Sequence, residues 1–155
     1  MDRKNFQLLI ADVEALVAEK KMREARTLLE ATSVPAQPGW HHVLARVCLE
    51  LGDLEQAVQH GTKAVGLAPR NSNYRALLAA CLYAASELQP LALDVAEIEA
   101  TRALEIDPQT PTADNTLGLV FLAQGRRHEA RKCFERAIKN APSDPAAQSN
   151  LARCA

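Results

Sequence analysis

Small apolar residues recur at one spacing in three parts of the chain. Each part has two alanines seven residues apart and a proline five residues later: Ala57, Ala64 and Pro69; Ala96, Ala103 and Pro108; Ala130, Ala137 and Pro142. Seven residues make two helical turns, so both alanines of a part lie on one face, where a neighbouring helix can approach closely. A proline just past this face marks the place where the helix ends. The pattern therefore predicts three amphipathic helices.

A second apolar segment precedes two of these helices. The segments "HHVLARVCLELGDLEQA" and "DNTLGLVFLAQGRRHEA" align end to end, with Gly52 and Gly125 at the same place in each. Glycine adopts the left-handed conformation that ends one helix and turns into the next. Asp53 and Gln56 have the spacing of a capping box, which would start the following helix. The predicted repeating unit is helix, tight turn, antiparallel helix.

Two short motifs predict the starts of later helices. Thr110–Pro111 and Asp144–Pro145 each place an N-cap residue before a proline. Proline is well suited to the first helical position because its missing N–H would have no helical partner there.

The repeat period slips once. Consecutive prolines of the pattern lie 39 residues apart between Pro69 and Pro108, but 34 residues apart between Pro108 and Pro142. The excess is "SELQP", residues 86–90, at the place where the other units have a glycine turn. We interpret it as a second helix lengthened by about a turn and a half, started by a capping box from Ser86. The alternative is a looser loop capped at Pro90. In either case it is a candidate protruding edge for a partner or a second copy.

Composition supports a helical chain. Of the 155 residues 48% are hydrophobic but only 4% are aromatic, so the apolar part is largely alanine, leucine, valine and isoleucine. The formal net charge of −1 gives no overall attraction to nucleic acid or acidic membranes. No apolar run approaches the roughly 20 residues of a membrane-spanning helix, and the N-terminus does not look like a signal peptide. We therefore expect a cytoplasmic location and no membrane or nucleic-acid partner.

Candidate chemical groups are scattered rather than clustered. Cys48, Cys81, Cys133 and Cys154 each lie in an apolar helical pattern and are expected to be small buried residues. His128–Glu129 lacks the second histidine of a zinc protease motif, because Lys132 stands at that place. His41 and His42 are adjacent and point in different directions on a helix. No catalytic residue, metal site or cofactor is predicted.

One predicted helix is locally basic. Its cationic side chains are Arg126, Arg127, Arg131, Lys132, Arg136 and Lys139. Glu129 and Glu135 interrupt the run, and few aromatic residues are available to stack on bases. A solvated helix face explains this charge better than a nucleic-acid interface.

Taken together, these positions resemble the tetratricopeptide repeat family. The best unit matches the family's pattern at Leu117, Gly118, Phe121, Ala130, Phe134, Ala137 and Pro142, with Asp114 at the place of a variable tryptophan. A second unit carries Leu44, Ala45, Cys48, Ala57, Gly61, Ala64 and Pro69. The middle unit carries Leu78, Ala79, Leu82, Ala96, Ala100, Ala103 and Pro108. The resemblance covers nearly the whole chain, most securely residues 40–142.

The resemblance implies an all-α fold, a right-handed α-solenoid of antiparallel helix pairs. About three and a half to four repeats and a C-terminal capping helix would form a single domain over residues 1–155. Its expected parts are a degenerate N-terminal helix pair at 3–32, repeats at 38–69, 72–108 (with the insertion at 86–90) and 111–142, and the capping helix at 144–154.

The resemblance also implies where a partner would bind. In this family the first helix of each unit lines a concave groove. The aligned residues are His42, Arg46 and Glu50; Asn73, Ala76, Ala80 and Tyr83; Asn115, Leu119 and Leu122; and Ser149 and Arg153. This groove has an apolar middle and arginines toward both ends, which suits an amphipathic helix or an extended apolar peptide. The alternative is that Ala80, Leu119 and Leu122 only pack within the stack.

Chaperone tails are not an expected ligand. Family members that bind them grip a C-terminal carboxylate with lysines, asparagines and an arginine. The aligned places here carry His42, Arg46, Leu77, Thr112 and Thr116, of which only Arg46 carries a fixed positive charge.

The sequence thus predicts a non-catalytic adapter that binds a partner protein or peptide. One alternative is a self-assembling structural module, or homo-oligomer, stacked end to end through the stripe of Ala147, Leu151 and Cys154. Another is a docking or regulatory segment of a larger enzyme, because such repeats often precede enzyme domains in the family.

Overall fold

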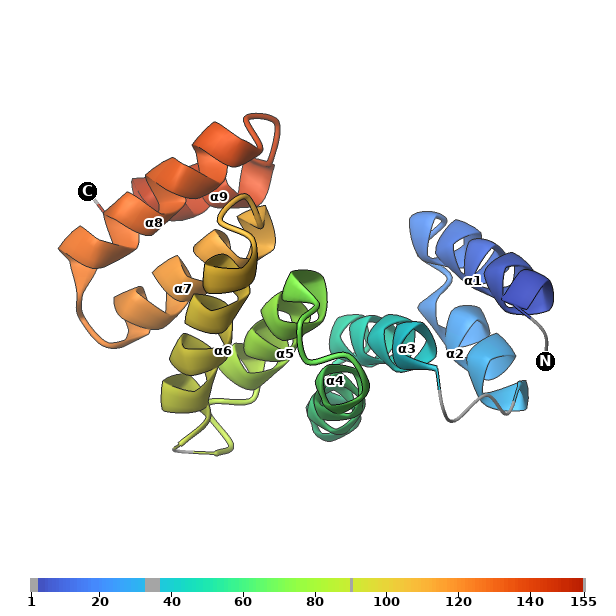
Figure 1. Ribbon diagram of the computed structural model, residues 1–155. Helices are drawn as coiled ribbons and strands as arrows, with labels where there is room; N and C mark the ends of the chain where they lie inside the picture. Colours follow the sequence, from blue (N-terminus) through green and yellow to red (C-terminus); the bar gives the residue numbers. More distant parts are fainter. Residues whose placement is uncertain (1–2, 33–36, 90, 155) are drawn as a thin grey trace. The chain divides into compact units, whose positions relative to one another are not determined.

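The computed structural model describes residues 3–32, 37–89 and 91–154, and every regular element in them is an α-helix (Figure 1). The chain is an all-α helical repeat solenoid. It divides into two compact units, residues 1–69 and 70–155. Unit 1 contains α1 (Arg3–Ala18), α2 (Met22–Ala31), α3 (Pro38–Glu50) and α4 (Leu54–Leu67). Unit 2 contains α5 (Ser72–Ala84), α6 (Ala92–Ile106), α7 (Pro111–Ala123), α8 (Arg127–Asn140) and α9 (Pro145–Ala152).

Unit 1 consists of two helix pairs, α1 with α2 and α3 with α4. Val13 and Leu29 are fully buried in the first pair. The indole Nε1 of Trp40, on α3, donates a hydrogen bond to the carbonyl oxygen of Leu29 at 3.2 Å. Arg26 of α2 also forms an ion pair with Asp53, the N-cap residue of α4, at 2.9 Å. These contacts join the two pairs of the unit.

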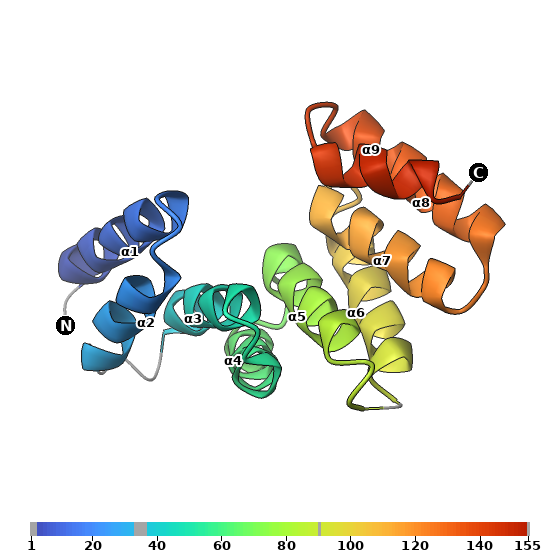
Figure 2. The same cartoon turned by 180° about the vertical axis from the view of Figure 1, so that it is seen from behind.

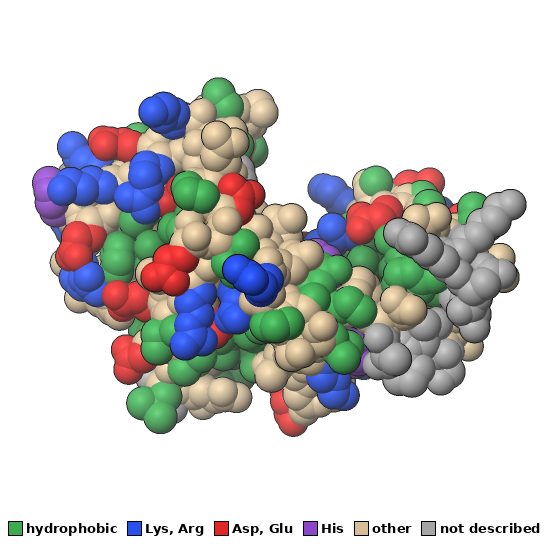
Figure 3. Space-filling view, in the orientation of Figure 1, with side chains coloured by type: hydrophobic (Ala, Val, Ile, Leu, Met, Phe, Trp, Pro, Cys, Tyr) green, Lys and Arg blue, Asp and Glu red, His purple; other side chains and the backbone are tan. Residues whose placement is uncertain are grey.

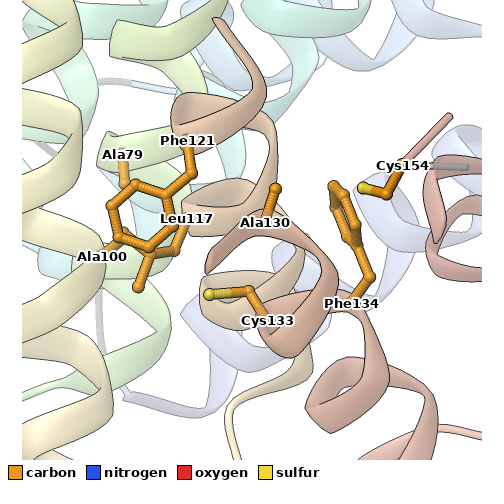
Figure 4. Close-up of a cluster of buried hydrophobic side chains, with 8 residues drawn as sticks. All are labelled: Ala79, Ala100, Leu117, Phe121, Ala130, Cys133, Phe134 and Cys154. Atoms are coloured by element: carbon orange, nitrogen blue, oxygen red, sulfur yellow. The ribbon is translucent and has the colours of Figure 1, made fainter. Parts of the chain in front are cut away.

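Unit 2 packs α5 against α6 and α7 against α8, with α9 covering α7 and α8 (Figure 2). Its main apolar cluster is made of Ala79, Ala100, Leu117, Phe121, Ala130, Cys133, Phe134 and Cys154 (Figure 4). The alanines leave room for the two phenylalanine rings, so the helices approach closely around few large side chains. Phe134 is fully buried, whereas Phe121 is 9% exposed.

The predicted turns and caps agree with the structure. Gly52 and Gly125 both have φ of +78°, the left-handed conformation that favours glycine. The Asp53 carboxylate accepts a hydrogen bond from the backbone N–H of Gln56, and Asp144 accepts one from Ala146 at 2.9 Å. Thr110 is the N-cap residue of α7, although its hydroxyl donates to the carbonyl of Asp107 rather than capping the helix.

The preferred interpretation of the insertion was wrong. α5 ends at Ala84 and α6 begins only at Ala92, so α6 has 15 residues against 14 in α4 and in α8. The backbone N–H groups of Ser86, Leu88 and Gln89 bond to the carbonyls of Tyr83 and Ala85 and so extend the end of α5 as a turn. In addition, a residue before a proline is biased away from helical geometry, and Gln89 precedes Pro90, which lies outside the described residues. The alternative, a loop, is the one the structure supports.

The structure also shows the state of the cysteines and the length and polarity of the helices. All four cysteines are buried free thiols, as expected. Burial raises the pKa of Cys48 and of Cys133, which keeps both thiols protonated. Across the described parts of the chain, every helix is too short or too polar to cross a lipid bilayer.

Candidate partner-binding surface

In unit 1 the predicted groove residues lie along α3. Glu50 is exposed, whereas His42 and Arg46 are half-buried. The Arg46 guanidinium pairs with the Glu14 carboxylate of α1, so it already serves a contact between helices. Burial, together with the nearby Arg46 charge, lowers the pKa of His42 to about 4, and its imidazole is therefore neutral at physiological pH. This part of the surface presents little free charge apart from Glu50.

In unit 2 three predicted residues come together in one pocket of about 320 Å³. Tyr83 comes from the end of α5, Leu122 from the end of α7, and Arg153 from the C-cap of α9. Ala123 and Arg127 complete the lining. The sequence alignment placed Tyr83, Leu122 and Arg153 on different repeats, and the packing of the unit brings them to one place.

A second depression continues this pocket. It shares Tyr83 and Ala123 and adds Ala84, Ser86, Glu87 and Leu93. The inserted turn therefore contributes side chains to the rim of the surface. We call the two depressions together the α5–α7–α9 surface, lined by residues 83, 84, 86, 87, 93, 122, 123, 127 and 153.

The α5–α7–α9 surface combines hydrogen-bond donors with apolar side chains. Arg153 donates to the amide oxygen of Asn150 at 3.1 Å, and Arg127 makes no ion pair with any residue that the structure describes. Tyr83, which carries a phenol hydroxyl, lines the same pocket. Two guanidinium groups and a phenol suit carbonyl or carboxylate oxygens of a ligand, while Leu122 and Ala123 suit apolar side chains.

Apart from Asn115, the remaining predicted residues of unit 2 fall into three groups. Asn73 and Ser149 are exposed. Ala80 and Leu119 are half-buried, and Leu119 and Leu122 both pack against the main apolar cluster, so each also has a structural role. Ala76 is only 1% exposed, because it packs with Ala103 and Ala113, and its side chain offers no surface to a ligand.

Asn115 takes part in a contact within the unit. Its amide oxygen accepts a hydrogen bond from Asn150 of α9 at 3.0 Å. This bond helps to hold α9 on α7 beside the pocket. Asn115 therefore has a positioning role in addition to any direct contact with a ligand.

Sequence reasoning missed Arg127 and a histidine pair. Arg127 was considered only as part of a basic helix. His41 of α3 and His60 of α4 place their Nδ1 atoms 2.9 Å apart, with the rings stacked and Trp40 packed edge-on against both. Burial lowers the pKa of His60 to about 4. The histidine pair could have been predicted by aligning α3 and α4 as antiparallel helices around the turn at Gly52, because His41 precedes this turn and His60 follows it. No group of three or more metal-ligating side chains occurs among the described residues.

Comparison with family models identifies the repeats. Residues 41–71 and residues 115–155 each match a model of the tetratricopeptide repeat. The chain is a tetratricopeptide repeat protein. A search of curated proteins gave no match.

Solved structures of tetratricopeptide repeat proteins share the fold. TTC0263, a thermophilic protein of this kind in Thermus thermophilus, is 24% identical, with a TM-score of 0.86 over 96% of this chain and 80% of that one. YrrB, described as having an unusual peptide-binding site, is 20% identical, with a TM-score of 0.71 over 91% of this chain and 71% of that one. The first repeat domain of Spaghetti (RPAP3), bound to the HSP90 peptide SRMEEVD, is 20% identical, with a TM-score of 0.66 over 77% of this chain and 91% of that one. At these identities the likeness shows the fold alone.

Proposed function

We propose that this protein is a non-catalytic adapter that holds a segment of a partner protein on the α5–α7–α9 surface. The observation that carries the proposal is the pocket itself: Tyr83, Leu122 and Arg153, expected from the repeat pattern to contact a partner, line one cavity. Tetratricopeptide repeats in general are non-catalytic interaction modules, and two of the similar structures are described as binding peptides. A cytoplasmic location and the absence of nucleic-acid and membrane partners are part of the same proposal.

The chemistry of the surface favours an extended peptide segment. Arg127 and Arg153 can pair with an acidic side chain, and Leu122 and Ala123 can contact an aliphatic one. An extended segment exposes its backbone carbonyls, which the Tyr83 hydroxyl and the arginines can bind as donors. The ligand that fits best is thus a peptide with at least one acidic and one apolar residue.

Affinity capture with a matched control tests the proposal. We expect Tyr83→Ala combined with Arg153→Glu to lose the proteins that wild type retains, because the change removes a ring and reverses a charge at the pocket. Lys139→Glu, a charge reversal on the exposed face of α8, should retain them. Circular dichroism checks that all three proteins are equally helical. Capture that persists unchanged in the pocket variant contradicts the proposal.

These substitutions are a sharper test than changes at Asn115 and Leu119. Replacing both by glutamate would move the oxygen that accepts from Asn150 by one methylene and place a charge against the apolar cluster. A loss of capture could then result from a displaced α9. The Tyr83 and Arg153 substitutions leave both partners of the Asn150–Asn115 bond in place. Arg153→Glu does remove the bond from Arg153 to Asn150, so Tyr83→Ala alone should also lose the captured proteins.

The structure argues against stacking through the predicted stripe and leaves the enzyme-docking role open as an alternative. The stripe considered for end-to-end stacking faces inward: Ala147 is fully buried, Cys154 is 7% exposed, and Leu151 packs on the main apolar cluster. It is therefore occupied by α7 and α8 and cannot also stack on a second copy. A role as a docking segment of a larger enzyme stays an alternative proposal, tested by whether the captured proteins include an enzyme whose activity depends on the adapter.

A further inference from the structure

Exposed apolar side chains concentrate on α6 and the turn before it. The large apolar residues exposed among the described parts are Leu8, Leu67, Leu88, Leu91, Val95, Ile98 and Ile106. Five of these seven lie between residues 88 and 106, and Figure 3 shows apolar side chains at the surface near the start of α6. Leu91, Val95 and Ile98 follow one another at spacings of four and three, which places them on one side of α6. We call these three residues the α6 stripe.

The corresponding helices of the other repeats lack such a stripe. Counting from the shared alanine, the places of Val95 and Ile98 are held by Gln56 and Gln59 in α4, and by Glu129 and Lys132 in α8. Val95 is 41% and Ile98 is 47% exposed, so neither contributes fully to the core of the unit. A solvated helix face is expected to be polar, and a contiguous apolar patch marks an interaction site.

The unpaired charges beside the stripe are negative. A depression around Ile98 is lined by Asp94, Glu97, Thr101, Arg102 and Glu105. Two of these residues are already engaged: Glu97 pairs with Arg126 at 3.1 Å, and Arg102 pairs with Glu99 at 3.1 Å. Asp94 and Glu105 form no ion pair with any described side chain. The free partners beside the stripe are thus two carboxylates.

We propose that the α6 stripe docks an amphipathic helix of a partner protein. The apolar face of that helix would cover Leu91, Val95 and Ile98, and its lysine or arginine side chains would pair with Asp94 and Glu105. Recognition of this kind, a helix laid on an apolar surface with charges at its flanks, is a recurring mode of peptide binding. The stripe shares no lining residue with the arginine-lined pocket, and the free charges beside it have the opposite sign, so the adapter would have two surfaces for two different ligands.

A second copy of this chain fits the stripe less well. A symmetric pairing of two α6 helices uses the same patch on both chains. In an antiparallel pair, the flank with Asp94 and Glu105 meets the same flank of the copy, which brings like charges together. A basic amphipathic helix avoids this repulsion and neutralises both carboxylates.

Binding of a designed helix to the full chain tests the proposal. The probe is a labelled peptide of about three heptads with leucine at positions a and d and lysine at e and g. Its matched control has glutamate in place of lysine. We expect micromolar binding of the lysine peptide by fluorescence anisotropy, with binding of the glutamate peptide at least about tenfold weaker.

Variants of the chain locate the binding. Val95→Glu with Ile98→Lys, the residues of α8, should weaken binding of the lysine peptide by at least about tenfold. Leu67→Glu, at an exposed leucine of α4, should change it by less than about twofold. Asp94→Asn with Glu105→Gln should weaken it several-fold and reduce its dependence on salt.

Three results would overturn the proposal. Equal binding of the lysine and glutamate peptides would remove the role of the carboxylates. Unchanged binding by the Val95→Glu, Ile98→Lys variant would remove the role of the stripe. The third result would come from sedimentation of the chain without peptide. If the wild type were a dimer and the Val95→Glu, Ile98→Lys variant a monomer, a second copy of the chain would cover the stripe.

Discussion

The two helix pairs of unit 2 fill the same pattern with different side chains. In α7 and α8, Gly118 faces Phe134 so closely that an added Cβ would lie 2.5 Å from the ring. In α5 and α6 the corresponding places are held by Ala79 and Ala100, both fully buried. One pair combines the smallest residue with a large ring, and the other combines two small residues. The comparison teaches that these two positions act together, so that a change at one requires a change at the other.

Each helix pair also has an ion pair with a buried carboxylate, and the acid and the base exchange helices between the two. Arg75 of α5 occupies the place of Asp114 of α7, which in the repeat pattern belongs to the variable tryptophan. Arg75 pairs with Glu99 of α6, whereas Asp114 pairs with Arg136 of α8 at 2.6 Å. Both arrangements compensate a buried carboxylate with a guanidinium, but the acid lies on opposite helices. In unit 2 the two helix pairs thus both join their helices through an ion pair, although the residue types at the two positions differ.

The largest expected effect comes from breaking the match between Gly118 and Phe134. We expect Phe134→Ala to lower the free energy of unfolding by about 4 kcal/mol, because it leaves a cavity at a fully buried site. Gly118→Ala alone should cost about 2 kcal/mol through overlap with the ring. Chemical denaturation followed by circular dichroism measures both.

The double variant sharpens this comparison. With Phe134→Ala already present, Gly118→Ala reproduces the pair of alanines in α5 and α6 and should be neutral or stabilising by up to about 1 kcal/mol, since alanine favours a helix over glycine. A cost for Gly118→Ala that is the same in both backgrounds would show that the two positions are independent.

Local features of the fold could be predicted from the sequence, whereas contacts across helices could not. The glycine turns and the N-caps at Asp53 and Asp144 depend on a few neighbouring residues, and the structure confirms them. The wrong length of α6 came from treating five extra residues as helix, although Gln89 precedes a proline.

The candidate site shows the same limit. Successive residues on a helix are turned by about 100°, so an alignment shifted by one residue exchanges a buried for an exposed position. Ala76 was predicted to line the groove and is buried, while Arg127 lines the pocket and was not predicted. The pairing of His41 with His60 joins side chains on two helices and requires their packing to be known.

The next largest effect is expected from the ion pair of α5 and α6. Arg75→Met should lower the free energy of unfolding by about 3 kcal/mol, because it leaves the buried Glu99 carboxylate without its main partner. Arg102→Met should cost less than about 1 kcal/mol, since Arg102 is 56% exposed and contributes a solvated bond. Denaturation of the two variants decides the order, and equal costs would show that Glu99 does not depend on Arg75.

A smaller effect is expected at the turns. Gly125→Ala should cost about 1 kcal/mol, because φ of +78° strains a residue with a Cβ. Replacing residues 86–90 by a single glycine should change stability by less than about 1 kcal/mol, since loop length contributes little. Thermal unfolding measures both, and a large loss on shortening would show that the inserted turn supports the core.

The buried Asp114 of α7 should make the free energy of unfolding depend on pH. Burial raises the pKa of Asp114, although its hydrogen bonds from Arg136 oppose that shift. Above its ordinary pKa of 3.8 the unfolded chain releases this proton before the folded chain does, so stability falls as the pH rises toward the folded pKa. Relative to Asp114→Asn, wild type should therefore lose stability as the pH rises through this window, measured by denaturation from about pH 3.5 to 7. If the difference in unfolding free energy between wild type and Asp114→Asn did not vary with pH, the raised pKa of Asp114 would be contradicted.

The smallest expected effect concerns the outer faces of α6 and α8. Val95→Glu with Ile98→Lys gives α6 the outward residues of α8, and both sites are exposed, so the free energy of unfolding should change by less than about 0.5 kcal/mol. A matched core change, Ala96→Leu at a fully buried site of the same helix, should cost about 2 kcal/mol by overpacking. If the outward change destabilises as much as the inward one, the α6 stripe is part of the core. If it leaves stability intact, these apolar side chains are not required for folding, which is the outcome that the proposed docking of a partner helix expects.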